Sequence, residues 1–174
     1  MTIAIGKKCF IASSATLIGD VTVGDNVAIM DNAVLRGDQN RILVGNNSNI
    51  QDNVTVHTDD DYPTLIGSHV SVGHNAIVHG SIVEDYVIVG MGAITLNGSR
   101  IGSGSVIAAG SVVTQNFSVP EKSLVAGIPG TVKRSNDPSL LEYAKLNALA
   151  YSNLRDGYLQ KKYDILRGSD LNHH

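Results

Sequence analysis

The chain has 174 residues, of which 43% are hydrophobic, and a formal net charge of −3 at pH 7. This size fits one globular domain with a sizeable core, and the scattered lysines and arginines exclude a basic surface for nucleic acid or for an anionic membrane. Cys9 is the only cysteine, which excludes an intrachain disulfide, and no run approaches the ~20 apolar residues of a membrane span. A reducing, cytoplasmic location is therefore predicted.

Aliphatic residues recur every six positions along most of the chain. These anchors are Ile11, Leu17, Val23, Ile29 and Leu35, then, after short slips, Val44, Ile50, Val56, Ile66, Val72, Val78, Val83, Val89, Ile101, Ile107 and Val113. Thr95 is the one polar residue at an anchor position. A period of six matches neither the 3.6 of a helix nor the alternation of an ordinary strand. It predicts an all-β parallel β-helix over residues 1–135, in which three hexads close one triangular coil of about 18 residues and the anchors fill the interior.

Two slips in the period predict loops that leave the corners of the coils. They are Gly37 to Leu43 and Thr58 to Leu65, and the second contains the acidic residues Asp59, Asp60 and Asp61. We expect these loops to form the walls of a site.

The hexapeptide pattern ends near Val125, and residues 136–174 are predicted to form a C-terminal helix and tail that pack on the β-helix. Asp137 followed by Pro138 is a typical N-cap and first helical residue. Gly157 is a predicted break in the helix. A stripe at helical spacing is expected to face the β-helix: Leu141, Ala144, Ala148 and Tyr151.

Anchors three hexads apart should stack one above another, and this places polar residues in columns. Leu35, Val56 and Val78 meet that condition. The residue after each is Arg36, His57 and His79, so these three side chains should form one outward-facing column. By the same count Asp52 lies near His74, and Gln51 near Gly73, in a second column on an adjacent face.

The histidines of these columns predict a metal site. His57 and His79, about one coil apart, can both reach one zinc ion at the roughly 2.0–2.1 Å of an imidazole ligand. His74 lies on another side of the triangle, so a neighbouring subunit of a cyclic trimer would have to supply it. A lone histidine is more often a solvated surface residue, which is how we interpret His69, whereas the shared register favours ligation. His173 and His174 are interpreted as a tail without function.

Several motifs carry a resemblance to a known family. They are RGD at Arg36 to Asp38, GNNSNIQDN at Gly45 to Asn53, His57, VSVGHNAIVHG at Val70 to Gly80 and GMGA from Gly90. Together they resemble the gamma-class carbonic anhydrases over roughly residues 10–135. The resemblance implies a left-handed winding of the β-helix, a homotrimer, and a zinc ion, or in some members iron or cobalt, held by His57 and His79 of one subunit and His74 of the next.

The resemblance also assigns roles around the metal. Arg36, Asp38 and Asp52 match the ion pairs that join subunits and organise the site, and Gln51 matches the residue that orients the nucleophile. Tyr151 and Asn153, in the string AYSN, resemble a Tyr-x-Asn pair near the metal. A tyrosine on an apolar stripe is also compatible with packing alone.

The implied activity is that of a zinc-dependent lyase, the reversible hydration of carbon dioxide to bicarbonate. Gln39 stands where the family has a glutamate, and the acidic run at Asp59 is short, so proton removal is expected to be slow or to depend on buffer. Three alternatives stay open: a metal-dependent acyl-coenzyme A thioesterase, a hexapeptide acyltransferase with a histidine base, and a metal-binding scaffold subunit of low activity.

Overall fold

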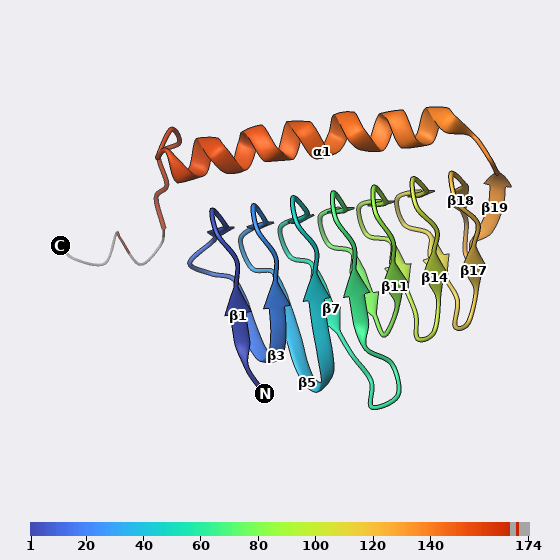
Figure 1. Cartoon of the computed structure of the whole chain (residues 1–174), viewed down its shortest axis with the longest axis horizontal. Coiled ribbons are helices and arrows are strands. Elements are labelled where there is room, and N and C mark those ends of the chain that lie inside the picture. The colour runs from blue at the N-terminus through green and yellow to red at the C-terminus, as the bar shows by residue number, and fades with distance from the viewer. Residues whose placement is uncertain (168–169, 171–174) are drawn as a thin grey trace.

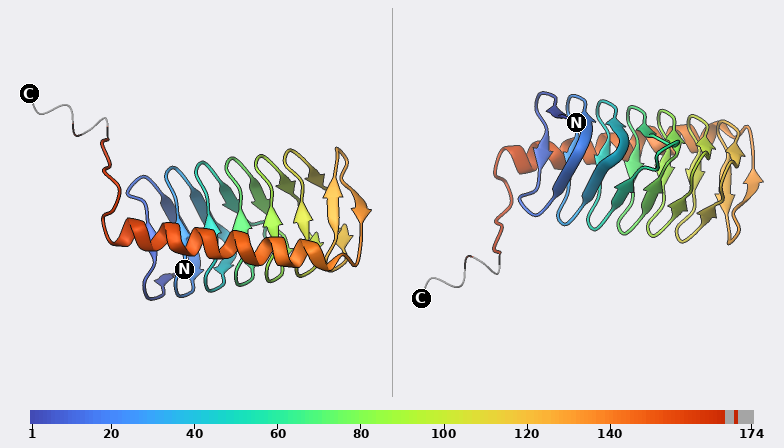
Figure 2. Two further views of the ribbon diagram at one scale, coloured as in Figure 1. Left: turned by 90° about the horizontal axis from the view of Figure 1, so that it is seen from above. Right: turned by 90° about the horizontal axis from the view of Figure 1, so that it is seen from below.

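A computed structural model describes residues 1–167 and 170, and it confirms a left-handed parallel β-helix followed by one C-terminal helix. Short strands stack along the axis of a solenoid, and the helix runs beside it along most of its length (Figures 1 and 2). Each coil contributes to three flat faces, as the hexapeptide period predicts.

The three faces follow from the strand pairing. Face 1 contains the first parts of β3 (Thr16–Val23) and β5 (Val34–Val44), then β7 (Thr55–His57), β10 (Ile77–His79), β13 (Ile94–Thr95) and β16 (Val112–Val113). Face 2 contains β1 (Ile3–Ile5), the second parts of β3 and β5, then β8 (Thr64–Ile66), β11 (Ile82–Val83), β14 (Arg100–Ile101) and β17 (Ser118–Val119). Face 3 contains β2 (Phe10–Ile11), β4 (Ala28–Ile29), β6 (Asn49–Ile50), β9 (Ser71–Val72), β12 (Ile88–Val89), β15 (Val106–Ile107), β18 (Leu124–Ala126) and β19 (Thr131–Arg134). All pairs are parallel except β18 with β19, which is antiparallel.

The anchors fill the interior as predicted. From Val23 to Val113 each aliphatic anchor is almost completely buried, whereas Ile11 and Leu17 in the first coil are only partly buried. Thr95 is also fully buried, and its hydroxyl shares a hydrogen bond of 2.8 Å with the buried Ser81 hydroxyl. The one polar anchor is therefore satisfied inside the core.

The corners of the coils use residues that tolerate a left-handed backbone. Three positions before most anchors the φ angle is positive, and the residue there is usually asparagine or glycine, which adopt this conformation most readily. These positions include Asn26, Asn32, Asn47, Asn53, Asn75, Gly92, Gly98, Gly104, Gly110 and Asn116. His69 occupies one of them and stacks on Tyr86 at 4.5 Å between ring centroids, which agrees with its interpretation as a corner residue.

The prediction of a loop at Gly37 to Leu43 is wrong. This segment belongs to the continuous strand β5, which turns the corner from face 1 to face 2. β3 runs beside β5 through the same corner, but the register shifts there: Gly37 pairs with Gly19 and Ile42 with Val21, so residues 38–41 form a bulge opposite Asp20. The second predicted loop is present between β7 and β8, and its tip is closed by a bridge between Asp59 and Tyr62.

The helix α1 spans Pro138–Leu159 and begins as predicted. The Asp137 side chain accepts a hydrogen bond from the Ser139 N–H, and Pro138 opens the first turn. The helix contacts β2, β4 and β9, so it packs on face 3 of its own chain. Within the described residues no helix has the length and hydropathy of a membrane span.

Two details of the predicted helix differ. The buried stripe begins at Leu140, with Leu141 only half-buried, and continues through Ala144 and Ala148. The helix also passes through Gly157 instead of breaking there. A Cβ at Gly157 would lie 2.7 Å from the Tyr163 ring, so this glycine permits close packing of the chain that follows the helix.

Candidate metal centre

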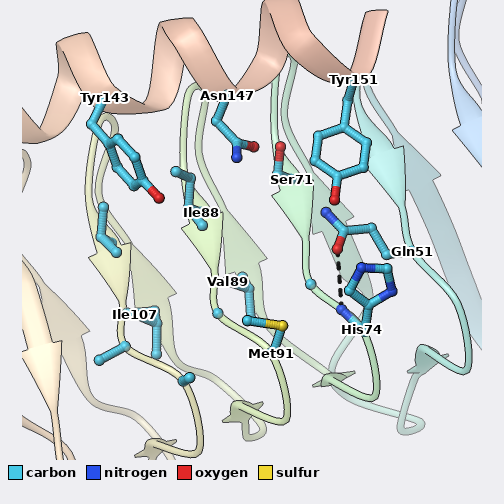
Figure 3. Close-up of a pocket in the computed structure, with 15 residues that line it drawn as sticks. Gln51, Ser71, His74, Ile88, Val89, Met91, Ile107, Tyr143, Asn147 and Tyr151 are labelled. Carbon is cyan, nitrogen blue, oxygen red and sulfur yellow. Dashed lines mark hydrogen bonds between the residues drawn. The ribbon is translucent and has the colours of Figure 1, made fainter. Parts of the chain in front are cut away.

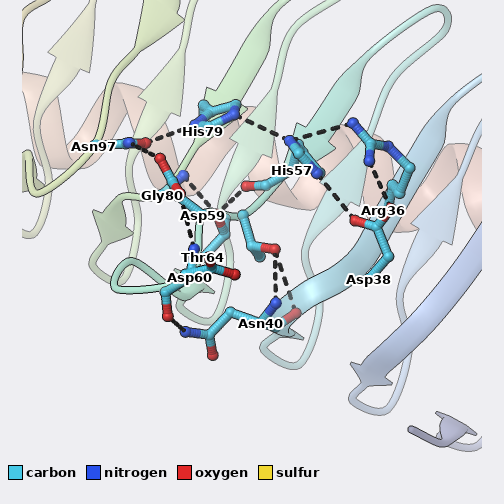
Figure 4. A network of polar contacts seen from close by, with 11 residues as sticks. Arg36, Asp38, Asn40, His57, Asp59, Asp60, Thr64, His79, Gly80 and Asn97 are labelled. Carbon is cyan, nitrogen blue, oxygen red and sulfur yellow. Dashed lines mark hydrogen bonds and ion pairs between the residues drawn. The ribbon is translucent and has the colours of Figure 1, made fainter.

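The register of β5, β7 and β10 produces the first predicted column. Arg36 pairs with His57, and His57 pairs with His79, on neighbouring strands of face 1. The two imidazole rings meet edge-on, at an interplanar angle of 72°, with His57 Nδ1 3.0 Å from His79 Nε2 (Figure 4). Arg36 Nη2 lies 3.5 Å from the same His57 nitrogen.

This spacing fits a shared metal ion. Two nitrogens bound to one tetrahedral zinc at roughly 2.0–2.1 Å lie about 3.3 Å apart. The 3.0 Å between His57 Nδ1 and His79 Nε2 is close to that value. A small outward movement of the rings would therefore complete the pair of ligands.

The other ring nitrogen of each histidine meets an oxygen acceptor. His57 Nε2 lies 3.1 Å from Asp38 Oδ1, and His79 Nδ1 lies 2.6 Å from Asn97 Oδ1. These contacts place protons on the outer nitrogens and leave lone pairs on the two that face each other. Because facing lone pairs repel, the arrangement favours a cation between them.

Asp38 is held in its ionised form. The hydrogen bond from Arg36 Nη1, at 2.6 Å, lowers the pKa of the Asp38 carboxyl below its usual value, and the contact with His57 acts in the same direction. The three residues of the first column and Asp38 thus form one continuous set of polar contacts.

The second column lies on face 3, where His74 and Gln51 follow β9 and β6. His74 Nδ1 contacts Asp52 Oδ2 at 2.8 Å, which leaves Nε2 as its free nitrogen. The buried Gln51 accepts the His74 backbone N–H through Oε1 at 3.2 Å (Figure 3) and donates from Nε2 to Asn49 Oδ1 at 3.0 Å. Gln51 is therefore fixed in one orientation beside His74.

The two columns do not meet within one chain. Among residues 1–167 and 170, no three histidine, cysteine, aspartate or glutamate side chains gather closely enough to hold a metal ion. His57 and His79 lie on face 1, whereas His74 lies on face 3, as the coil count predicts. The supply of His74 by a neighbouring subunit stays a prediction.

A pocket of about 280 Å³ lies between α1 and face 3, next to Gln51 and His74 (Figure 3). Tyr151 points from the helix toward Gln51, and burial raises the pKa of its phenol, as does the charge of Asp52, while a hydrogen bond with Gln51 opposes the shift. Asn153 is exposed and does not line this pocket. The structure thus brings Tyr151 to the second column but does not bring Asn153 there.

Sequence reasoning missed several polar neighbours of the site. Asn97 belongs to the coil after His79, and its amide nitrogen donates to Asp59 Oδ2 at 2.7 Å. Thr64 is buried; its hydroxyl donates to the His57 carbonyl and accepts the Gly80 N–H at 2.9 Å. One more coil along the first column reaches Leu96, so counting coils leads only to the neighbour of Asn97, and the contact with Asp59 depends on the path of a loop.

Several known proteins are similar to this chain over most of its length. A family model described as the hexapeptide repeat of succinyl-transferase matches residues 63–97 and 93–115. A probable carbonic anhydrase of Methanocaldococcus jannaschii is 47% identical, over 87% of this chain and 96% of that protein. Gamma carbonic anhydrase 2, mitochondrial, of Arabidopsis thaliana is 42% identical, over 86% of this chain and 56% of that protein. A solved hexapeptide transferase family protein from Anaplasma phagocytophilum is 34% identical with a TM-score of 0.77, over 90% of this chain and 98% of that one.

Proposed function

Because the chain belongs to the gamma-class carbonic anhydrase family, we propose that it catalyses the reversible hydration of carbon dioxide to bicarbonate at a zinc site. The observation that supports this most directly is the pair of facing nitrogens, His57 Nδ1 and His79 Nε2, 3.0 Å apart. A lyase of this kind needs a metal with an open position, and two histidines of one chain provide only two of the three protein ligands of such a site.

The third ligand in this proposal is His74 of the next subunit in a homotrimer. His74 carries the same kind of support as the other two histidines, since Asp52 holds its Nδ1. Three neutral imidazoles leave one coordination position for water or substrate, which is the arrangement of catalytic zinc sites. Iron(II) or cobalt(II) also accept imidazole ligands, so the metal bound in the cell is part of the test.

The chain's own residues would prepare the reaction around that metal. When bound, the metal would lower the pKa of a water molecule toward about 7 and so supply the nucleophile. Gln51, fixed by Asn49 and by the His74 backbone, keeps one lone pair of Oε1 to orient that water. Arg36 and Asp38 hold the His57 ring in place.

The proton released in this reaction would pass to the solvent. Gln39 has no titratable group at the position where the family resemblance expects a glutamate, so buffer molecules would accept the proton. Turnover should therefore rise with the concentration of an imidazole buffer.

The test is stopped-flow hydration of carbon dioxide by protein reconstituted anaerobically with zinc or iron(II). His74→Ala should abolish the activity, whereas His69→Ala, at a corner stacked on Tyr86, should retain it. If one metal ion binds per chain and no hydration occurs in any buffer, the proposal is wrong.

A second candidate, acyl transfer or thioester hydrolysis, is favoured by the pocket under α1. Its walls next to His74 are mainly apolar and include Ile88, Val89, Met91 and Ile107, which suit an acyl chain better than carbon dioxide. Acetyl-coenzyme A distinguishes the two reactions. Cleavage that requires the metal but no acceptor indicates a thioesterase, and metal-independent transfer to an added amine or alcohol indicates an acyltransferase.

A further inference from the structure

Two residues outside the predicted site control the outer nitrogen of His79. Asn97 follows β13, and its Oδ1 lies 2.6 Å from His79 Nδ1. Its Nδ2 donates to Asp59 Oδ2 at 2.7 Å, across 38 positions of sequence (Figure 4). His79, Asn97 and Asp59 thus form a line that leads from the facing imidazoles to the loop between β7 and β8.

The chemistry of the three groups determines which atom donates and which accepts in each of these hydrogen bonds. An ionised carboxylate accepts hydrogen bonds and donates none, so the NH₂ side of the Asn97 amide must point toward Asp59. The amide oxygen then points toward His79 and accepts a proton from Nδ1. As a result Nε2 keeps its lone pair on the side of His57.

Asp59 is itself held firmly. Its Oδ1 accepts the Asp60 N–H at 2.8 Å, and its backbone exchanges two hydrogen bonds with Tyr62, at 3.0 and 3.1 Å. Gly80 leaves the room that the amide needs, since a Cβ there would lie 2.3 Å from Asn97 Oδ1. The loop therefore presents its carboxylate at a fixed place.

The alternative tautomer of His79 would leave no lone pair for a metal ion. If His79 carried its proton on Nε2, it could donate to His57 Nδ1 across the present 3.0 Å. The two histidines would then satisfy each other, and neither lone pair would be free for a metal. His57 and His74 have carboxylates directly on their outer nitrogens, whereas His79 reaches one only through Asn97.

We propose that Asp59, acting through Asn97, is a positioning residue that holds His79 in the tautomer able to bind a metal and prevents the two facing histidines from pairing with each other. This proposal uses the proposed function only in treating His57 and His79 as metal ligands. It assigns to the loop between β7 and β8, predicted from the sequence only as a wall of the site, the additional role of fixing the His79 tautomer.

The first experiment measures metal binding by the full chain. Asp59→Asn removes the obligatory acceptor and lets the Asn97 amide turn over, so zinc affinity, determined by competition with a chromophoric chelator, should fall about 10- to 100-fold. Asp60→Asn, an exposed neighbour in the same turn, is the matched control and should bind as the wild type does.

A double variant that exchanges the carboxylate and the amide tests whether zinc binding can be restored. In the double variant Asp59→Asn with Asn97→Asp, the new amide can donate to the new carboxylate, which accepts the His79 Nδ1–H directly. Zinc affinity should return to within a few-fold of the wild type. A merely structural role for the loop predicts no rescue, because two substitutions would then disturb it more than one.

The second readout is the tautomer itself, from ¹⁵N–¹H NMR of the metal-free chain at about pH 8.5, above the usual histidine pKa of about 6.5. The His79 signals should indicate Nδ1–H in the wild type and a mixture with Nε2–H in Asp59→Asn. Identical His79 signals and identical zinc affinity in Asp59→Asn and Asp60→Asn would overturn the proposal. Loss of carbon dioxide hydration alone, with these readouts as expected, would count only against the proposed function.

Discussion

Each of the three histidines in the proposed site has one nitrogen held by an oxygen of its own chain. His57 meets Asp38, His74 meets Asp52, and His79 meets Asn97. Such contacts fix the ring orientation and increase the basicity of the nitrogen that binds the metal. The proposed metal site would thus depend on the acceptors around it as well as on the imidazoles.

Asp52→Ala tests this preparation at His74. Without the carboxylate 2.8 Å from Nδ1, the ring loses its fixed tautomer, and zinc affinity should fall about 10- to 100-fold in a chelator competition. Asp61→Ala, on the exposed tip of the loop between β7 and β8, should leave the affinity unchanged. Equal affinities of the two variants would contradict a role for Asp52.

The buried hydroxyl pair of Thr95 and Ser81 gives a prediction about stability. Thr95→Val leaves the Ser81 hydroxyl without its partner in the core and should lower the free energy of unfolding by about 1–3 kcal/mol. The double variant with Ser81→Ala removes both polar groups and should be close to the wild type. Urea unfolding of the single and double variants measures the difference, and a double variant less stable than Thr95→Val would refute the explanation.

The columns at Arg36 and His74 could be predicted from the sequence because stacking in a β-helix depends only on counting hexads. The polar partners could be predicted only in part. Asp52 lies in register with His74, whereas Asn97 reaches Asp59 through a loop whose course no period fixes. Asn153 was predicted by likeness of a short string and is exposed in the structure.

At the scale of elements, β5 and α1 show where periodicity fails as a guide. Extra residues between two anchors suggested a loop after Gly37, yet they form only a bulge within β5, because the strand pairs with β3 on both sides of them. On α1, the stripe contains small residues, Ala144 and Ala148, which let the helix approach face 3. A helical period could not distinguish Leu140 from Leu141 as its first buried residue.

Asp31, between β4 and β5, links the core coils to the segment after the helix. The hydrogen bond from Ser14 is the main reason that its pKa is lowered, and Arg167 contributes through an ion pair at 2.6 Å. Since the folded pKa lies below that of the unfolded chain, the stabilisation is present above about pH 4 and is lost as the pH falls through the folded value.

Two variants should separate these contributions. Ser14→Ala and Arg167→Ala should each raise the pKa of Asp31, as followed by NMR titration of the carboxyl. Asp137, whose pKa is lowered by Ser139, serves as an internal reference and should not move. An unchanged pKa of Asp31 in either variant would contradict the contribution of that partner.

At the scale of the whole molecule, the proposed sharing of the site between subunits makes a prediction about mixtures of variants. His57→Ala and His74→Ala each lack one ligand, and each alone should be inactive. In trimers reassembled from equal amounts of both, about a quarter of the interfaces combine an intact His57 with an intact His74. Hydration activity and tightly bound zinc should therefore return to about a quarter of the wild-type level.

The matched control mixes His57→Ala with His79→Ala. These two residues come from the same face of one chain, so no arrangement of the subunits restores both ligands. Recovery in this control, or none in the first mixture, would contradict a site built from two chains.

The antiparallel strand β19 has a further consequence for how copies of this chain can associate. A solenoid of parallel coils is an open stack, and a second molecule could in principle add its first coil to the last one and begin a fibre. On face 3 the reversed direction of β19, with the charges of Lys133 and Arg134, offers no parallel edge to copy. Axial growth is therefore blocked on face 3, which is compatible with the proposed trimer, since its contacts would lie on the sides of the solenoid where both histidine columns are found.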